Sequence, residues 1–139
     1  MLIDLYHQET SAIANKYSFI LQKLRKKLIK KENLDEIEET AMLHALQVLT
    51  ENAIGKAKHI LKSANETVPV SAYDAVQAVI RLGYIAEDDK LYWNSIIGVR
   101  NRIVHDYMNV DAGLLTKLVA QEHEKKLVEF LCQKFPTPK

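Results

Sequence analysis

The sequence has little of what β-sheets, disulfides and membrane spans require. Glycine and proline are scarce, at 4 and 3 of 139 residues, whereas strongly β-rich folds usually need more turn-forming residues. The single cysteine, Cys132, cannot form an internal disulfide, which fits a reducing compartment and a place near an apolar core. No apolar run approaches the roughly 20 residues that span a bilayer. We therefore expect a cytoplasmic protein with no membrane association.

An excess of charge of one sign is also missing. The net charge is +1, so no global field indicates nucleic acid or an anionic membrane, and any anion site must be local. The basic residues from 23 to 31 are expected to form a solvated helix face, with a phosphate-binding surface as the alternative. There is no glycine-rich phosphate loop. Four of the five histidines show no metal-ligand spacing, so we expect no metal site and no cofactor. These four are His7, His44, His59 and His123.

What is present is helical patterning over nearly the whole chain. Leu, Ala, Lys, Glu and Gln are abundant and favour helices, and apolar residues recur at steps of three and four. The pattern predicts helices over about 2–31, 33–63, 71–83, 87–108 and 109–131, with Trp93 and the tyrosines mostly in the core. We therefore predict an all-α fold: an antiparallel four-helix bundle with one additional short helix, as a single domain over residues 1–139.

One segment, residues 99–107, concentrates polar chemistry at the end of the fourth helix. Within eight residues it holds two guanidiniums, an amide, an imidazole and a phenol: Arg100, Asn101, Arg102, His105 and Tyr107. Histidine exchanges protons near neutral pH, and arginine binds two phosphate oxygens while staying charged. On a helix, Arg100 and His105 are separated by about 140°. They converge only if the helix unwinds near His105 or a second subunit completes the site.

This segment resembles the motif of the HEPN superfamily. Arg100, four residues, His105, one residue and Tyr107 is similar to the signature of HepT, the toxin of HepT–MntA toxin–antitoxin pairs. The resemblance implies an endoribonuclease that needs no metal, in which a ribose 2′-hydroxyl attacks the adjacent phosphorus. It implies proton transfer by His105, phosphate binding by Arg100, and support from Asn101 and Arg102. It also implies a homodimer or larger assembly that brings two motifs together over RNA.

The resemblance assigns two further residues. Tyr107 corresponds to the tyrosine onto which the partner, a minimal nucleotidyltransferase of the MntA type, transfers AMP from ATP. The added phosphate would occupy the cationic site and block RNA. Glu51, on the second helix, is similar to an acidic residue that many relatives place near the motif.

Each residue alone also has a simpler interpretation. Arg100 could pair with a carboxylate, His105 could stabilise a helix C-terminus, and Tyr107 could lie in the core or an interface. Glu51 could be a carboxylate that satisfies an arginine. Two rival hypotheses for the whole chain therefore stay open: a non-catalytic HEPN binding module that serves as substrate or regulatory subunit of a nucleotidyltransferase, and a purely structural helical bundle.

Overall fold

The computed structural model describes residues 2–134, apart from the side chains of residues 2, 3 and 107. Every regular element in that range is helical, which confirms the all-α prediction. The α-helices are α1 (Leu2–Ile29), α2 (Glu36–Ser63), α3 (Ala72–Arg81), α4 (Lys90–His105), α5 (Ala112–Ala120) and α6 (Lys125–Cys132). Two short 3-10 turns, η1 (Glu87–Asp89) and η2 (Tyr107–Asn109), precede and follow α4.

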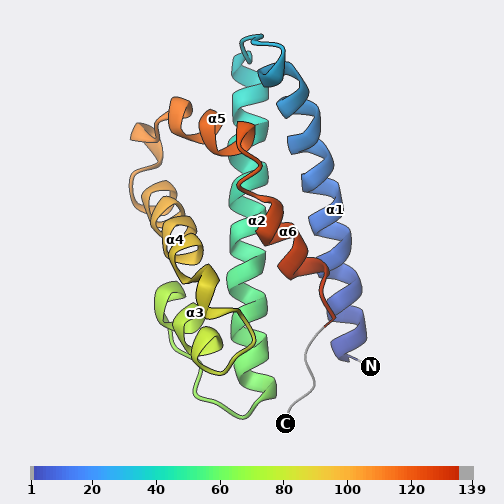
Figure 1. The fold of residues 1–139 in the computed structure, drawn as a ribbon, viewed down its shortest axis with the longest axis vertical. Helices are drawn as coiled ribbons and strands as arrows, with labels where there is room; N and C mark the ends of the chain where they lie inside the picture. The colour runs from blue at the N-terminus through green and yellow to red at the C-terminus, as the bar shows by residue number, and fades with distance from the viewer. Residues whose placement is uncertain (1, 135–139) are drawn as a thin grey trace.

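The two longest helices, α1 and α2, form an antiparallel hairpin that carries the rest of the chain (Figure 1). The helices α3 and α4 pack beside α2, and α6 lies across α1 and α2. The helix α5 crosses the hairpin nearer the turn between α1 and α2. Because α2 contacts both α3 and α4, side chains from these three helices can meet at one place.

Local signals that the sequence shows plainly set several helix ends. Asp35 and Glu38 form a capping box at the start of α2, with each side chain accepting a hydrogen bond from the other's backbone N–H. The Ser71 hydroxyl accepts from the Asp74 backbone N–H at the start of α3. Gly83 follows α3 with a φ of +86°, a conformation that glycine adopts without strain. The helix boundaries predicted there are confirmed.

The final helix, which the pattern predicted as one element over 109–131, is two helices. The chain turns between α5 and α6, and Glu122 takes a φ of +56° there. The backbone N–H groups of Glu122 and His123 close the end of α5 by bonding back to its carbonyls. Arg25 of α1 fixes the same turn, because it donates to the Val119 carbonyl at 2.7 Å and forms an ion pair with Glu124. Arg25 is therefore buried rather than solvated, unlike the helix face predicted for residues 23–31.

A continuous apolar core joins the helices. Trp93 of α4 is 3% exposed and packs edge-on against Phe130 of α6, with ring centroids 5.1 Å apart. The expected core position of Trp93 is confirmed. Cys132 is exposed, so its predicted place near the core is wrong: the last turn of α6 buries Leu131 and leaves the next side chain outside.

Lys56 is a buried cation at the place where α6 ends. It is only 1% exposed, and its Nζ atom donates to the carbonyl oxygens of Phe130 at 2.5 Å and Gln133 at 2.7 Å. Carbonyls at the end of a helix lack partners within the helix, so Lys56 caps α6 from α2. Burial disfavours the charged ammonium and lowers the pKa of Lys56 to about 8.

This burial predicts that the protein becomes more stable as the pH rises from 8 to 10. There the unfolded chain retains the Lys56 proton, because its pKa is 10.5, while the folded chain loses it. The free energy of unfolding should therefore increase by about 2 kcal/mol. Burial raises the pKa values of Tyr6 and Tyr92, and the opposing effect of these tyrosines grows as the pH approaches 10.0, their value in the unfolded chain, so the rise due to Lys56 is measured most cleanly between pH 8 and 9. Urea titrations at three pH values measure the slope of the free energy of unfolding against pH. Lys56→Met should flatten it, and an unchanged slope in that variant would contradict this role of Lys56.

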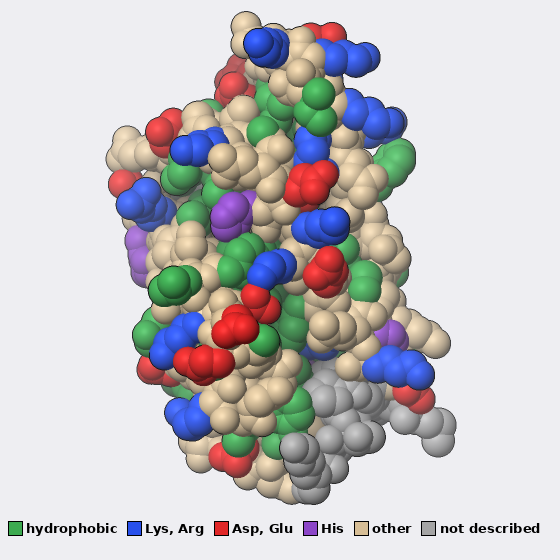
Figure 2. All heavy atoms as spheres, in the orientation of Figure 1, with side chains coloured by type: hydrophobic (Ala, Val, Ile, Leu, Met, Phe, Trp, Pro, Cys, Tyr) green, Lys and Arg blue, Asp and Glu red, His purple; other side chains and the backbone are tan. Residues whose placement is uncertain are grey.

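The surface agrees with the small net charge. On the face that carries α6, Lys and Arg side chains are interspersed with Asp and Glu (Figure 2). Among the helices of the described residues, none combines the length and apolar character needed to cross a bilayer.

Candidate functional site

The polar segment lies in the last turns of α4. The helix extends through His105, and the Asp106 backbone N–H closes it by donating to the Arg102 carbonyl at 2.8 Å. Ile103 is buried and anchors this turn against the protein, whereas the His105 side chain is exposed. The imidazole is thus held on a packed helix and still accessible to a ligand.

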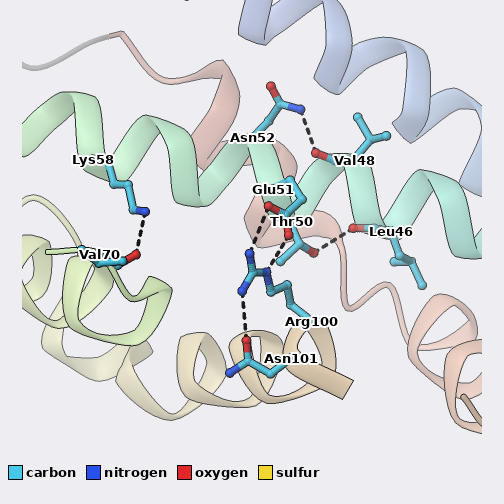
Figure 3. A network of polar contacts seen from close by, with 9 residues as sticks. All are labelled: Leu46, Val48, Thr50, Glu51, Asn52, Lys58, Val70, Arg100 and Asn101. Carbon is cyan, nitrogen blue, oxygen red and sulfur yellow. Dashed lines mark hydrogen bonds and ion pairs between the residues drawn. The ribbon is translucent and has the colours of Figure 1, made fainter. Parts of the chain in front are cut away.

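Arg100 reaches from α4 to α2 and is oriented by two partners (Figure 3). Its Nε atom donates to Glu51 Oε1 at 2.6 Å, and Nη2 donates to Oε2 of the same carboxylate at 3.4 Å. Its Nη1 atom donates to Asn101 Oδ1 at 3.1 Å. Because a guanidinium has five N–H donors, two remain beyond these three contacts with described side chains. The Arg100 side chain is 24% exposed, so a ligand can reach it.

An open hollow of about 810 Å³, part of it solvent, brings these groups together. It is bordered by Glu51, Arg100, Asn101 and His105. Helix α4 does not unwind before His105, yet both Arg100 and His105 border the hollow within one chain. Their separation of about 140° on the helix surface therefore does not keep Arg100 and His105 from lining one hollow, which α2 and α3 complete.

Two residues of the hollow were missed by the sequence argument. Lys58 of α2 borders it and donates from Nζ to the Val70 carbonyl at 2.9 Å (Figure 3). Tyr73, in the first turn of α3, also borders it. Neither residue belongs to a motif, and only the packing of α2, α3 and α4 brings them beside Arg100.

One predicted site residue, Arg102, lies apart from this hollow, and for another, Tyr107, only the backbone is described. Arg102 is exposed and borders a different hollow of about 640 Å³, between the end of α4 and the start of α5. The backbone of Tyr107 lies in η2, two residues after His105, but its side chain lies outside the described residues. The hollow at Arg100 therefore contains Arg100, Asn101, His105 and Glu51 from the predicted set.

The charges around the hollow favour an anion. Arg100 and Lys58 contribute two cations and Glu51 one carboxylate, so the described lining carries a positive surplus that protonation of His105 would increase. A guanidinium with two remaining donors matches two oxygens of a phosphate. An imidazole near it can exchange a proton with a bound group.

Two of the other histidines pack against tyrosine rings. The His44 ring meets the Tyr17 ring edge-on, with centroids 5.6 Å apart, and the His59 ring lies 4.2 Å from that of Tyr6. In the described part of the chain, no three His, Cys, Asp or Glu side chains gather in a way that could hold a metal ion.

Comparison with known proteins gives the same fold and a family. Residues 13–133 match the family described as "Ribonuclease HepT-like". A crystal structure of a toxin–antitoxin with AMP-PNP is 17% identical, with a TM-score of 0.73 over 91% of this chain and 97% of that one. A tri-AMPylated Shewanella oneidensis HEPN toxin, solved in complex with MNT antitoxin, is 18% identical, with a TM-score of 0.74 over 91% and 96%. No curated protein matches the chain.

The helix order and these matches define the fold as that of a HEPN-type helical domain. Because the family match spans most of the sequence, the chain belongs to the HepT-like ribonuclease family.

Proposed function

We propose that this protein is the toxin of a toxin–antitoxin pair and cleaves RNA in the hollow beside Arg100. The observation that carries the proposal is the meeting of Arg100, Asn101 and His105 at one open, cationic site, with Glu51 holding the guanidinium at 2.6 Å. Membership of a ribonuclease family supports the same reaction.

The proposed chemistry needs a proton-transfer group and a fixed cation. A ribose 2′-hydroxyl attacks the adjacent phosphorus, and the bond from phosphorus to the 5′-oxygen breaks. The products are a 2′,3′-cyclic phosphate and a free 5′-hydroxyl. His105 transfers the proton, and Arg100 stabilises the extra negative charge on the phosphate oxygens. Asn101 and Glu51 position the guanidinium, since both accept hydrogen bonds from it.

The active form is proposed to be a homodimer or larger assembly in the cytoplasm. Two apolar side chains near the end of α4, Val104 and Met108, are 46% and 88% exposed. Their burial between copies would favour association, and it would bring two Arg100–His105 sets close to one RNA. Arg102, on the outer side of α4, would then support the site of the neighbouring copy.

The direct test is cleavage of cellular RNA by the purified protein, with and without EDTA. The proposal predicts the same cleavage in both samples, since no metal takes part, and product ends that carry a cyclic phosphate. Failure of the wild-type protein to cleave any RNA, or loss of cleavage in EDTA that added Mg²⁺ restores, would refute the mechanism.

Adenylylation of Tyr107 is the proposed means of neutralisation. The solved Shewanella oneidensis toxin is tri-AMPylated in complex with its MNT antitoxin, and Tyr107 follows His105 closely in η2. Co-expression with a nucleotidyltransferase of this type should add one or more AMP masses to the Tyr107 peptide and suppress RNA cleavage. Tyr107→Phe should stay unmodified in mass spectrometry. A modified Tyr107→Phe protein would place the acceptor elsewhere.

The second candidate is a non-catalytic module that serves as substrate or regulatory subunit of the nucleotidyltransferase. It is favoured by the ion pair between Arg100 and Glu51, which already engages two N–H donors of the guanidinium. Expression without the partner separates the two hypotheses: a toxin arrests growth, and a binding module does not.

A further inference from the structure

The hollow beside Arg100 has a second wall that the proposed reaction does not use. It is formed by the end of the loop before α3 and the first turn of that helix. Val70 is 94% exposed and Tyr73 is 47% exposed. The hollow is therefore cationic on the side of α2 and α4 and apolar and aromatic on the side of α3.

Tyr73 differs from the other tyrosines whose side chains are described. The rings of Tyr6, Tyr17 and Tyr92 each pack against another ring, and Tyr84 packs against the apolar core. Among the described residues, no ring or cation contact involves the Tyr73 ring. An aromatic side chain with an exposed face, bordering a hollow, is available to a flat ligand.

The wall that carries Tyr73 is held in place on both sides. Before it, the Val70 carbonyl accepts a hydrogen bond from Lys58 of α2 at 2.9 Å. The Ser71 hydroxyl caps the helix by accepting from the Asp74 N–H at 3.0 Å. Ala72, which directly precedes Tyr73, is buried at 7% exposure. The ring is thus attached to a fixed backbone, which lowers the entropy cost of ligand binding.

We infer that Tyr73 stacks on a nucleobase of single-stranded RNA next to the phosphate that Arg100 binds. A nucleotide combines an anionic phosphate with a flat, apolar base, and the hollow places cations opposite an exposed aromatic ring. Stacking requires an unpaired base, so the substrate is single-stranded. This inference rests on the proposed ribonuclease function and specifies its substrate.

The test is binding of a short 2′-O-methyl RNA, which lacks the free 2′-hydroxyl that cleavage needs. Tyr73→Leu should weaken its binding by about 5- to 100-fold, while Tyr73→Phe, which keeps the aromatic face, should stay within about twofold. Phe19→Leu is the matched control, since Phe19 is an aromatic side chain 57% exposed on α1. It should bind as the wild type does. Thermal unfolding of each variant checks that it folds.

Abasic nucleotides complete the experiment. An abasic nucleotide is placed at each position of the RNA in turn. At one position it should remove the difference in RNA affinity between the wild type and Tyr73→Leu. If the wild type binds and cleaves RNA but Tyr73→Leu binds equally well, or Tyr73→Phe is as weak as Tyr73→Leu, stacking is refuted and the ribonuclease stands. If the wild type neither binds nor cleaves RNA, both proposals are refuted together.

Discussion

His105→Ala is expected to lower the rate of RNA cleavage by at least about 100-fold, the usual scale for loss of a general acid or base. The imidazole borders the hollow that contains Arg100, and histidine is the side chain suited to proton transfer near neutral pH. Its exposure means that truncation leaves no cavity in the core, so stability should hardly change. Single-turnover cleavage of a defined RNA measures the rate, and thermal unfolding measures stability.

A matched substitution separates catalysis from loss of a surface histidine. His44 is also exposed, on α2, and lies outside the lining of the hollow. His44→Ala should cleave RNA at the wild-type rate. RNA binding by His105→Ala should persist, because Arg100 and its carboxylate partner remain. Equal cleavage by wild type and His105→Ala would remove His105 from the reaction.

The starts of α2 and α3 were predictable because their causes are local. Asp35 and Ser71 cap α2 and α3 through atoms three residues away, and Gly83 ends α3 through its own backbone freedom. The end of α5 has no such signal. Glu122 adopts a positive φ without being glycine, and the apolar spacing continues across the turn. What stabilises the break is Arg25, ninety-nine residues before Glu124, and no local pattern shows that contact.

The candidate site also combines residues that a local pattern shows with residues that only the packing of helices brings together. Arg100, Asn101 and His105 lie within six positions of one helix, so a motif could reveal them. Glu51 was found through family resemblance, and its contact with Arg100 depends on how α2 packs against α4. Lys58 and Tyr73 became visible only with the fold. Residues that touch a ligand from different helices share no spacing in the sequence.

The arrangement also explains why a weakly charged protein can be expected to bind RNA. Its net charge is only +1, so binding cannot rely on a long-range field. The described lining instead combines a local surplus of cations with an exposed aromatic ring. Such a site should bind one or two nucleotides rather than contact a long stretch of the RNA backbone.

Removing one partner of the buried ion pair between Arg25 and Glu124 is expected to destabilise the fold by about 3–5 kcal/mol. Arg25 is 9% exposed and Glu124 is 4% exposed. Substitution of either residue therefore leaves the charge of the other buried without its counter-charge. In Glu124→Gln the guanidinium keeps its bond to the Val119 carbonyl but loses its counter-charge. Because domains are stable by only about 5–15 kcal/mol, this loss should be plain in urea unfolding.

The double variant Arg25→Met/Glu124→Leu tests the cause of that loss. With both charges replaced by apolar groups, no buried charge is left unpaired, so most of the lost stability should return. Lys126→Met breaks the partly exposed pair with Asp89 instead and should cost less than about 1 kcal/mol. If the double variant were as unstable as the sum of its single substitutions, the two side chains would not act as a pair. The turn that separates α5 from α6 would then depend on backbone bonds alone.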